Sequence, residues 1–508
     1  MNLKKNFNPI ENLLLKLFIF GFLFFTFLIF FSDFISDQTL EIKFKSILML
    51  IIPFFLTIFY IYDKNRDSIP LFQIYLLYFS IPAGLFGLIG YKLENLIFNN
   101  VDSFKMTDDI YVEALDVTLI FCYILLLIFT FSKYLKFNHV KRKNSIQISQ
   151  GIIPFIFFLY FIFIDKESFV DQINLILFPL GIFSSLIFYY FFIKSHKLIL
   201  KIIFILPIVI VLLHYILNWT LLNMVIILIS LFILNIKITN KVNYFLIFLI
   251  FLTPISLSKI KNEIRIIISD QYVVNDFKND NFQNKSIIKR FKIIFDFYDQ
   301  REKYSFDHQI NDLIKMVEKN RDKTIEIAPN LISKSSLDFF LLRISENNFN
   351  LSRMIFYKNK ETKFINGESL NQILISLVPR VIWSEKPSMS LGNKFGKSFN
   401  ILNHDNKTTS ININWLNEFY WNFKLQGIIL GSILLGAFLI CVNLISNRLN
   451  DMNFIIVLSS ISMILIPESN LSIYLTFSLK SFVLLYVISF FINKLLNKSK
   501  FKSHDISN

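Results

Sequence analysis

Aromatic, cationic and acidic side chains gather in one part of this chain. Three of its four tryptophans lie between residues 383 and 421, close to Arg380 and Glu418. An aromatic face can stack on a sugar, and an arginine can hold a phosphate through paired hydrogen bonds. The combination therefore suggests a site for a sugar beside a charged leaving group. For Trp415 and Tyr420 the alternative is an anchoring role at a membrane interface.

Arg380 lies in a rigid elbow that follows a predicted amphipathic helix. Apolar residues recur with helical spacing between the turn at 366–367 and Pro379, and proline ends the helix. Trp383 and Lys386 follow Arg380 in the same short run, so the elbow is both aromatic and cationic.

A second helix is predicted to begin at Ser336, which is a favourable N-cap residue. It is apolar on nearly all sides, a pattern typical of a buried helix. Arg343 therefore has poor surroundings for a solvated charge. It is either an arginine that reaches out to water or a cation that faces an anionic ligand near the membrane.

The composition indicates what must position these residues. The chain has 508 residues, of which 54% are hydrophobic, 61 are Phe and only 18% are charged. Disordered, collagen-like and ordinary soluble proteins do not have this composition. We therefore expect an all-α, polytopic helical membrane protein. The formal net charge of +15 could indicate binding to nucleic acid, so the location of the charge decides its meaning.

Twelve apolar windows are long enough, or nearly so, to cross a bilayer. The fifth and the eleventh are the shortest. The first is too long for a cleavable signal peptide. The windows are 13–31, 46–62, 69–90, 117–132, 151–164, 172–193, 198–217, 219–236, 242–258, 425–446, 453–467 and 471–493.

Lysine and arginine in the short loops predict the orientation. With the N-terminus inside, the inner segments hold 19 of these residues and the outer short loops hold five. Both termini are then cytoplasmic. We expect a membrane domain of nine helices over 1–258, a helical outer domain over 259–424, three helices over 425–494 and a basic cytoplasmic tail over 495–508. Because the outer domain never meets nucleic acid, a nucleic-acid partner is not expected.

No metal or cofactor is expected. Cys122 and Cys441 both fall inside apolar windows, and no phosphate-binding loop, dinucleotide fingerprint or paired-cysteine motif is present. The outer domain carries 26 Lys and Arg against 19 Asp and Glu, without the tight carboxylate pair of a magnesium site. A basic domain of this kind could attract an anionic substrate.

Residues 367–436 resemble the end of the outer loop in O-antigen polymerases, which join oligosaccharide repeat units in bacterial surface polysaccharide assembly. Arg265 and Arg343 also fall where such proteins carry arginines. The family often has glycine soon after the Asn-Phe pair, whereas here Lys424 follows Phe423. The matching patterns are Gly367 to Ser369, Pro379 to Pro387, Gly392 to Gly396 and Glu418 to Phe423, followed by a span led by Gly427.

The resemblance implies a metal-independent glycosyltransferase in the bacterial inner membrane, with undecaprenyl-diphosphate-linked glycans as substrates and a chain-length regulator as a further partner. Arg265, Arg343 and Arg380 would bind the diphosphate, because arginine stays charged and binds phosphate bidentately. A sugar hydroxyl benefits from a general base, for which Glu418 is our first choice and His404 our second.

Lys480 completes the predicted substrate-binding set, which also contains Trp383, Lys386, Trp415 and Tyr420. It lies within the last apolar window, where an ionisable group is a functional candidate by default. Either it faces a water-filled cavity that reaches lipid phosphates, or the span begins later.

Two alternatives to a polymerase are open: a ligase with the same architecture, and a transporter with an unusually long loop. An O-antigen ligase would pass the glycan to a lipid core and should depend on a loop histidine, for which His404 is the candidate. A transporter or lipid flippase would keep working without Arg343 and Arg380.

Overall fold

The computed structural model describes most of the membrane part and the last third of the chain. Arg265, Arg380, the first apolar window and part of the ninth lie outside the described residues. The described ranges are 39–62, 70–97, 107–132, 146–163, 170–217, 221–239, most of 243–253, 336–378, 391–402 and most of 410–504, with the single positions 383, 385, 386 and 404.

Every regular element in this part of the chain is a helix, as the all-α prediction requires. Ten of the twelve apolar windows coincide with a helix. The first group is α2 Leu40–Tyr62, α3 Leu71–Ile97, α4 Asp108–Ser132, α5 Ser149–Phe163, α6 Val170–Lys194, α7 Leu198–Leu217 and α8 Leu221–Thr239. The second is α12 Ser336–Phe356, η4 Glu361–Lys363, α13 Glu368–Leu377, α14 Leu391–Ser398, α15 Trp415–Arg448, α16 Asp451–Ser460, η5 Ser462–Leu465 and α17 Leu471–His504.

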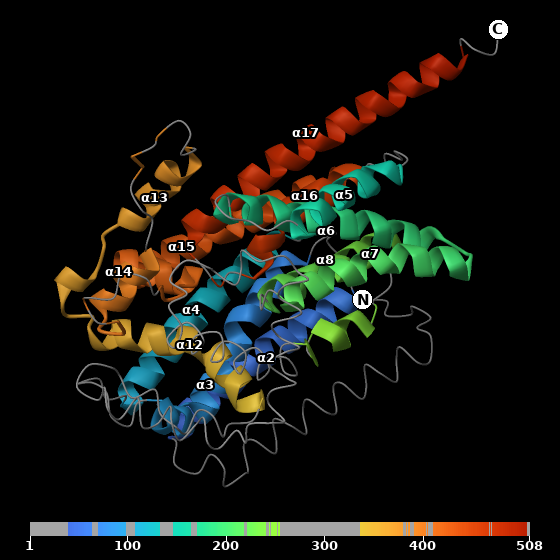
Figure 1. The fold of residues 1–508 in the computed structure, drawn as a ribbon. Helices are drawn as coiled ribbons and strands as arrows, with labels where there is room; N and C mark the ends of the chain where they lie inside the picture. Colours follow the sequence, from blue (N-terminus) through green and yellow to red (C-terminus); the bar gives the residue numbers. More distant parts are fainter. Residues whose placement is uncertain are drawn as a thin grey trace, which may run out of the picture.

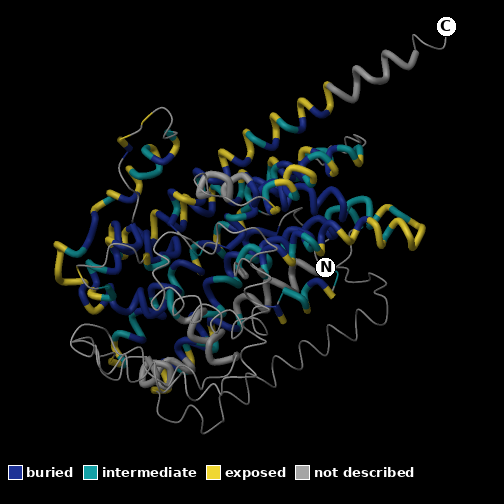
Figure 2. Tube along the Cα trace, in the orientation of Figure 1, coloured by how far each residue is buried: buried dark blue, intermediate teal, exposed yellow. Residues whose placement is uncertain are grey.

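Six of these helices are long and apolar enough to cross a membrane, which supports a membrane-embedded protein. They lie within α4, α6, α7, α8, α15 and α17, while α3, α5 and α16 carry shorter apolar stretches. The two windows predicted to be short, the fifth and the eleventh, correspond to α5 and α16. Figure 2 shows exposed positions along α7, whose outward residues include Leu198, Ile202 and Leu206. Such a face suits lipid rather than water.

Contacts between distant helix ends agree with the predicted alternation of the spans. Gln150 at the start of α5 donates to Asn493 near the end of α17 at 2.6 Å. Lys237 at the end of α8 reaches the Ser446 carbonyl near the end of α15 at 3.5 Å. The distribution of Lys and Arg predicts that all four residues lie at helix ends on the same side of the membrane. Which side is the cytoplasm stays a prediction.

The helices α12, α13 and α14 gather at the opposite end of the bundle, on the left of Figure 1. α12 packs against α3 and α4. Lys358, just beyond α12, pairs with Glu113 of α4 at 2.6 Å, and Asn347 donates to the Tyr78 hydroxyl at 3.3 Å. These contacts hold α12, which belongs to the predicted outer domain, against two of the membrane helices.

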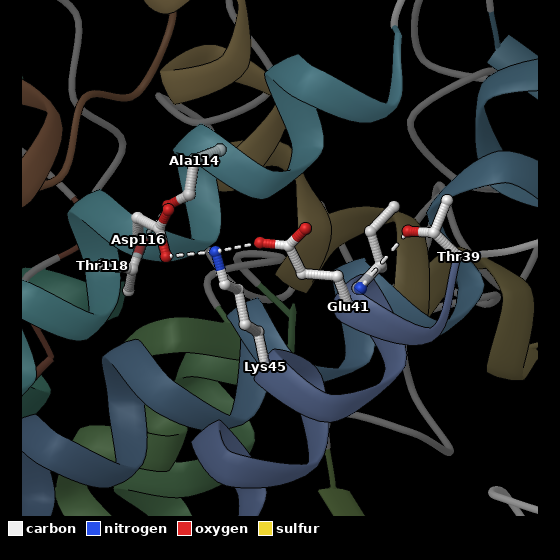
Figure 3. A network of polar contacts seen from close by, with 7 residues as sticks. Thr39, Glu41, Lys45, Ala114, Asp116 and Thr118 are labelled. Carbon is white, nitrogen blue, oxygen red and sulfur yellow. Dashed lines mark hydrogen bonds and ion pairs between the residues drawn. The ribbon is translucent and has the colours of Figure 1, made fainter.

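A polar network at the same end joins α2 to α4. Lys45 of α2 lies 2.8 Å from Glu41 and 2.6 Å from Asp116 of α4 (Figure 3). The carboxylates are substantially exposed, so each pair contributes only about 0–1 kcal/mol. Gly87 of α3 lets α3 pack closely against α2, because a Cβ atom at this position would overlap the Ser46 hydroxyl of α2.

Candidate functional site

The candidate site is built on the first two turns of α15, residues 415–422, which are buried throughout. The Asn414 side chain caps this helix by accepting the Asn417 N–H at 2.8 Å. The helix therefore begins ten residues before the predicted span at 425. A kink at Phe423 and Lys424 interrupts it, so residues 415–422 form a separate short helix ahead of the spanning part.

Glu418 is 1% exposed and is held by the start of another helix. Its Oε2 accepts the N–H of Leu471, the first residue of α17, at 2.7 Å. Asn470 caps the same helix by accepting the Ile473 N–H at 3.0 Å. The partial positive charge at a helix N-terminus favours a nearby carboxylate in its ionised form. The arrangement thus orients Glu418 and partly offsets the effect of burial, which raises the pKa of the Glu418 carboxyl above its usual range.

The second carboxylate oxygen is available for another group. Oε1 of Glu418 has no hydrogen-bond partner among the described residues, and neither has the side-chain oxygen of Asn417 or Asn422. The Ser369 hydroxyl lies near enough to interact with the Glu418 carboxylate, but it does not meet hydrogen-bond geometry to Oε1. Unpaired buried acceptors cost free energy, so this group is suited to accept a hydroxyl proton from a bound molecule.

Two of the family-like patterns meet directly at this point. Asn422 Nδ2 donates to the Ser369 hydroxyl at 2.7 Å and to the Glu418 carbonyl at 2.7 Å. The backbone also joins, because the Ile365 N–H reaches the Trp421 carbonyl at 3.3 Å. Ser369 and Asn422 belonged to the quoted patterns, but no role was predicted for them. Their places in the sequence patterns that resemble O-antigen polymerases could have identified them as site residues.

The glycine-rich pattern forms α14 and packs beside the same segment. Side chains at Gly392 or Gly396 would overlap residues 410–411 and Leu402, so glycine allows the chain to approach closely there. Phe395, between the two glycines, contacts Trp421 with ring centroids 5.2 Å apart. α14 therefore supports the segment that carries Glu418.

The aromatic side chains that were expected to bind sugar differ in exposure. Trp415 and Tyr420 are buried. The Trp415 ring packs against Tyr75 at 5.8 Å, and Tyr420 packs against Phe364 at 6.2 Å. Neither ring face is open to a ligand in this arrangement, which favours a packing role. Trp383 is exposed, and its sugar-binding role stays a prediction.

Lys386 serves the end of α13 in this structure. Its ammonium group is buried and donates to the Ser376 carbonyl at 3.1 Å and the Val378 carbonyl at 3.0 Å. The last carbonyls of a helix lack intrahelical partners, and a cation there also suits the helix dipole. Lys386 thus caps the C-terminal end of the helix that carries Ser369, and its role in substrate binding stays a prediction.

Replacing Lys386 by methionine is expected to lower the free energy of unfolding by about 1–3 kcal/mol, because two carbonyls lose their donor. Thermal unfolding of the purified protein measures this. The control is Lys394→Met, which removes only an exposed pair with Glu368 and should cost about 0–1 kcal/mol. Equal stability of the Lys386 variant and the wild type would leave substrate binding as its role.

The remaining predicted residues are placed less fully. His404 is exposed in a turn, and Lys480 is exposed on α17. Arg343 lies on α12, but its side chain is outside the described part, as are Arg265 and Arg380. The predicted arginine clamp therefore stays a prediction. Among the described residues no group of three or more His, Cys, Asp or Glu side chains could hold a metal ion.

Lys424 has a backbone conformation that favours glycine, with φ 50° and ψ −135°. Lys424 directly follows the Asn-Phe pair, soon after which O-antigen polymerases often carry glycine. The side chain compensates by pairing with Glu361 and by lying 4.9 Å from the centre of the Phe364 ring. A residue held in such a region costs roughly 1–3 kcal/mol.

Replacing Lys424 by glycine is expected to give a more stable protein than replacing it by alanine, by about 1 kcal/mol. Both variants lose the contacts with Glu361 and Phe364, so the difference isolates the backbone strain. Thermal unfolding of the two purified variants measures it. An alanine variant at least as stable as the glycine variant would show that Lys424 is not strained.

No protein-family model, curated protein or solved structure matches this chain.

Proposed function

We propose that the chain polymerises undecaprenyl-diphosphate-linked oligosaccharide repeat units at the outer face of the bacterial inner membrane. Two observations support this proposal. The first is the set of short patterns between 367 and 436 that resemble O-antigen polymerases. The second is the meeting of these patterns around Glu418, a buried carboxylate held by the Leu471 N–H with one oxygen unpaired. The burial of the Glu418 carboxylate with one oxygen unpaired is the observation that carries the proposal.

In the proposed reaction Glu418 acts as a general base. Its Oε1 takes the proton from a hydroxyl at the non-reducing end of the acceptor repeat unit. The acceptor oxygen then forms a bond to the anomeric carbon of the donor glycan. The bond from that carbon to the diphosphate breaks, and the electron pair leaves with undecaprenyl diphosphate. Water then removes the proton from Glu418.

The diphosphate leaves without needing a proton if cations neutralise its charge. Arg265, Arg343 and Arg380 are the proposed cations, because guanidinium groups bind phosphate oxygens in pairs and remain charged. This part of the proposal rests on the sequence alone.

Deletion of the gene, followed by gel analysis of surface polysaccharide, tests the proposed reaction. Loss of a polymerase should leave single repeat units attached to the core. Loss of a ligase should leave no attached repeat units, and loss of a flippase should deplete lipid-linked units at the outer face. A ladder of unchanged length and abundance would contradict the proposal.

A further inference from the structure

The short helix α13 has its polar side toward the protein and an apolar side exposed. Ser369 and Ser376 are buried, whereas Leu370, Leu374 and Leu377 are 38%, 70% and 38% exposed. The leucines follow the i, i+4, i+7 spacing and form one stripe along the helix, called the leucine stripe below.

The third side of α13 carries exposed polar residues beside the half-buried Ile375. Glu368 and Asn371 lie there, and Glu368 pairs with Lys394 of α14. The helix thus has one face for protein, one for an apolar surrounding and one for water. Helices that lie in the plane of a membrane surface have this division.

Contacts with the neighbouring helices hold α13 in this inverted orientation. The Ser376 hydroxyl bonds to the Thr476 hydroxyl and lies 3.5 Å from the Ser472 carbonyl, both on α17. Ser369 accepts from Asn422 of α15 at 2.7 Å. In water the reverse orientation would be favoured, because burying each leucine stabilises by about 1.5–3 kcal/mol.

We propose that the leucine stripe lies among the lipid acyl chains of the bilayer leaflet next to α13. The helix packs on α17, which is long and apolar enough to cross a membrane. α17 itself exposes Ile473 and Leu479. The stripe therefore lies beside a spanning helix that also exposes apolar side chains, and the water-facing side of α13 lies at the headgroups.

The position of the leucine stripe among the acyl chains determines how deep the candidate site lies in the membrane. Ser369 on the protein side of α13 contacts the segment that carries Glu418, so the site lies close to the headgroup level. A diphosphate attached to a membrane-embedded polyprenyl chain lies at that same level. This consequence rests on the proposed function, whereas the lipid contact of the leucine stripe does not.

Spin labelling of the full-length protein in phosphatidylethanolamine and phosphatidylglycerol vesicles tests the lipid contact. Leu374→Cys and Asn371→Cys are each made in a background with Cys122→Ala and Cys441→Ala, and both are labelled with a nitroxide. Oxygen concentrates in the acyl region, and a nickel complex stays in water. We expect a label at 374 to favour oxygen over nickel several-fold more than a label at 371.

Two outcomes would overturn the proposal. Equal nickel access at 374 and 371 would show that the stripe is in water. A label at 374 shielded from both reagents would show that protein covers the stripe. In that case a short spin–spin distance between labels at 374 would identify the covering protein as a second copy of this chain. Because none of these readings depends on activity, the lipid contact can be correct even if the polymerase proposal fails.

Discussion

Replacing Glu418 by glutamine is expected to reduce polymer formation by about 10²–10⁴-fold while the protein stays folded. The glutamine oxygen can still accept the Leu471 N–H that now reaches Oε2 at 2.7 Å. The amide cannot take up a proton, so the acceptor hydroxyl would lose its base. The measurement is the length distribution of surface polysaccharide in cells that carry only the variant, relative to the amount of protein in the membrane.

The matched control is Glu361→Gln, which changes an exposed carboxylate paired with Lys424 in the same way. It should leave the ladder near the wild-type length. Thermal unfolding of the purified Glu418 variant should show a loss of no more than about 1–2 kcal/mol, since the cap on α17 persists. Wild-type ladders from Glu418→Gln would remove Glu418 from the mechanism, and a large loss of stability would identify its role as structural.

Replacing Gly427 by alanine is expected to disrupt both folding and activity. The kink brings the Phe419 carbonyl oxygen so close to Gly427 that an added Cβ atom would lie well inside 3.0 Å of it. A backbone oxygen cannot move aside as a side chain can, so this overpacking should cost about 1–3 kcal/mol or more. The strain would also displace Glu418, which is adjacent to Phe419. Thermal unfolding and ladder length measure the two effects.

Gly436→Ala is the control for this prediction. An added Cβ atom there would meet side-chain atoms of Ile128, the nearest being its terminal methyl group, rather than a backbone atom. Its effect on stability should be clearly smaller than that of Gly427→Ala. If the two variants were equally stable and equally active, the close contact at the kink would not be important for the site.

Local chemistry made some of these elements predictable. The turn at 366–367 and the proline at 379 bracket a helix, and α13 runs from Glu368 to Leu377. Asn366 and Gly367 both have positive φ, as their residue types favour. The apolar windows coincide with the long helices because a bilayer requires about 20 apolar residues.

Other features depend on contacts between distant residues. The short helix at the start of α15 was not predicted, because residues 415–422 are aromatic and polar and do not resemble a span. The Asn414 cap and burial against α14 make them helical. The Leu471 N–H that holds Glu418 belongs to another helix, and no sequence pattern links the two. Burial of Trp415 and Tyr420 likewise follows from packing that the interface pattern alone does not reveal.

The most direct test of the proposed polymerase uses the purified chain in vesicles with undecaprenyl-diphosphate-linked repeat units. The proposal predicts a ladder of lengthened lipid-linked glycan and release of one undecaprenyl diphosphate for each linkage formed. The Glu418→Gln variant, folded and present in equal amount, should produce neither. The account would be contradicted if the wild type released no undecaprenyl diphosphate and made no lengthened product, or if the variant polymerised as the wild type does.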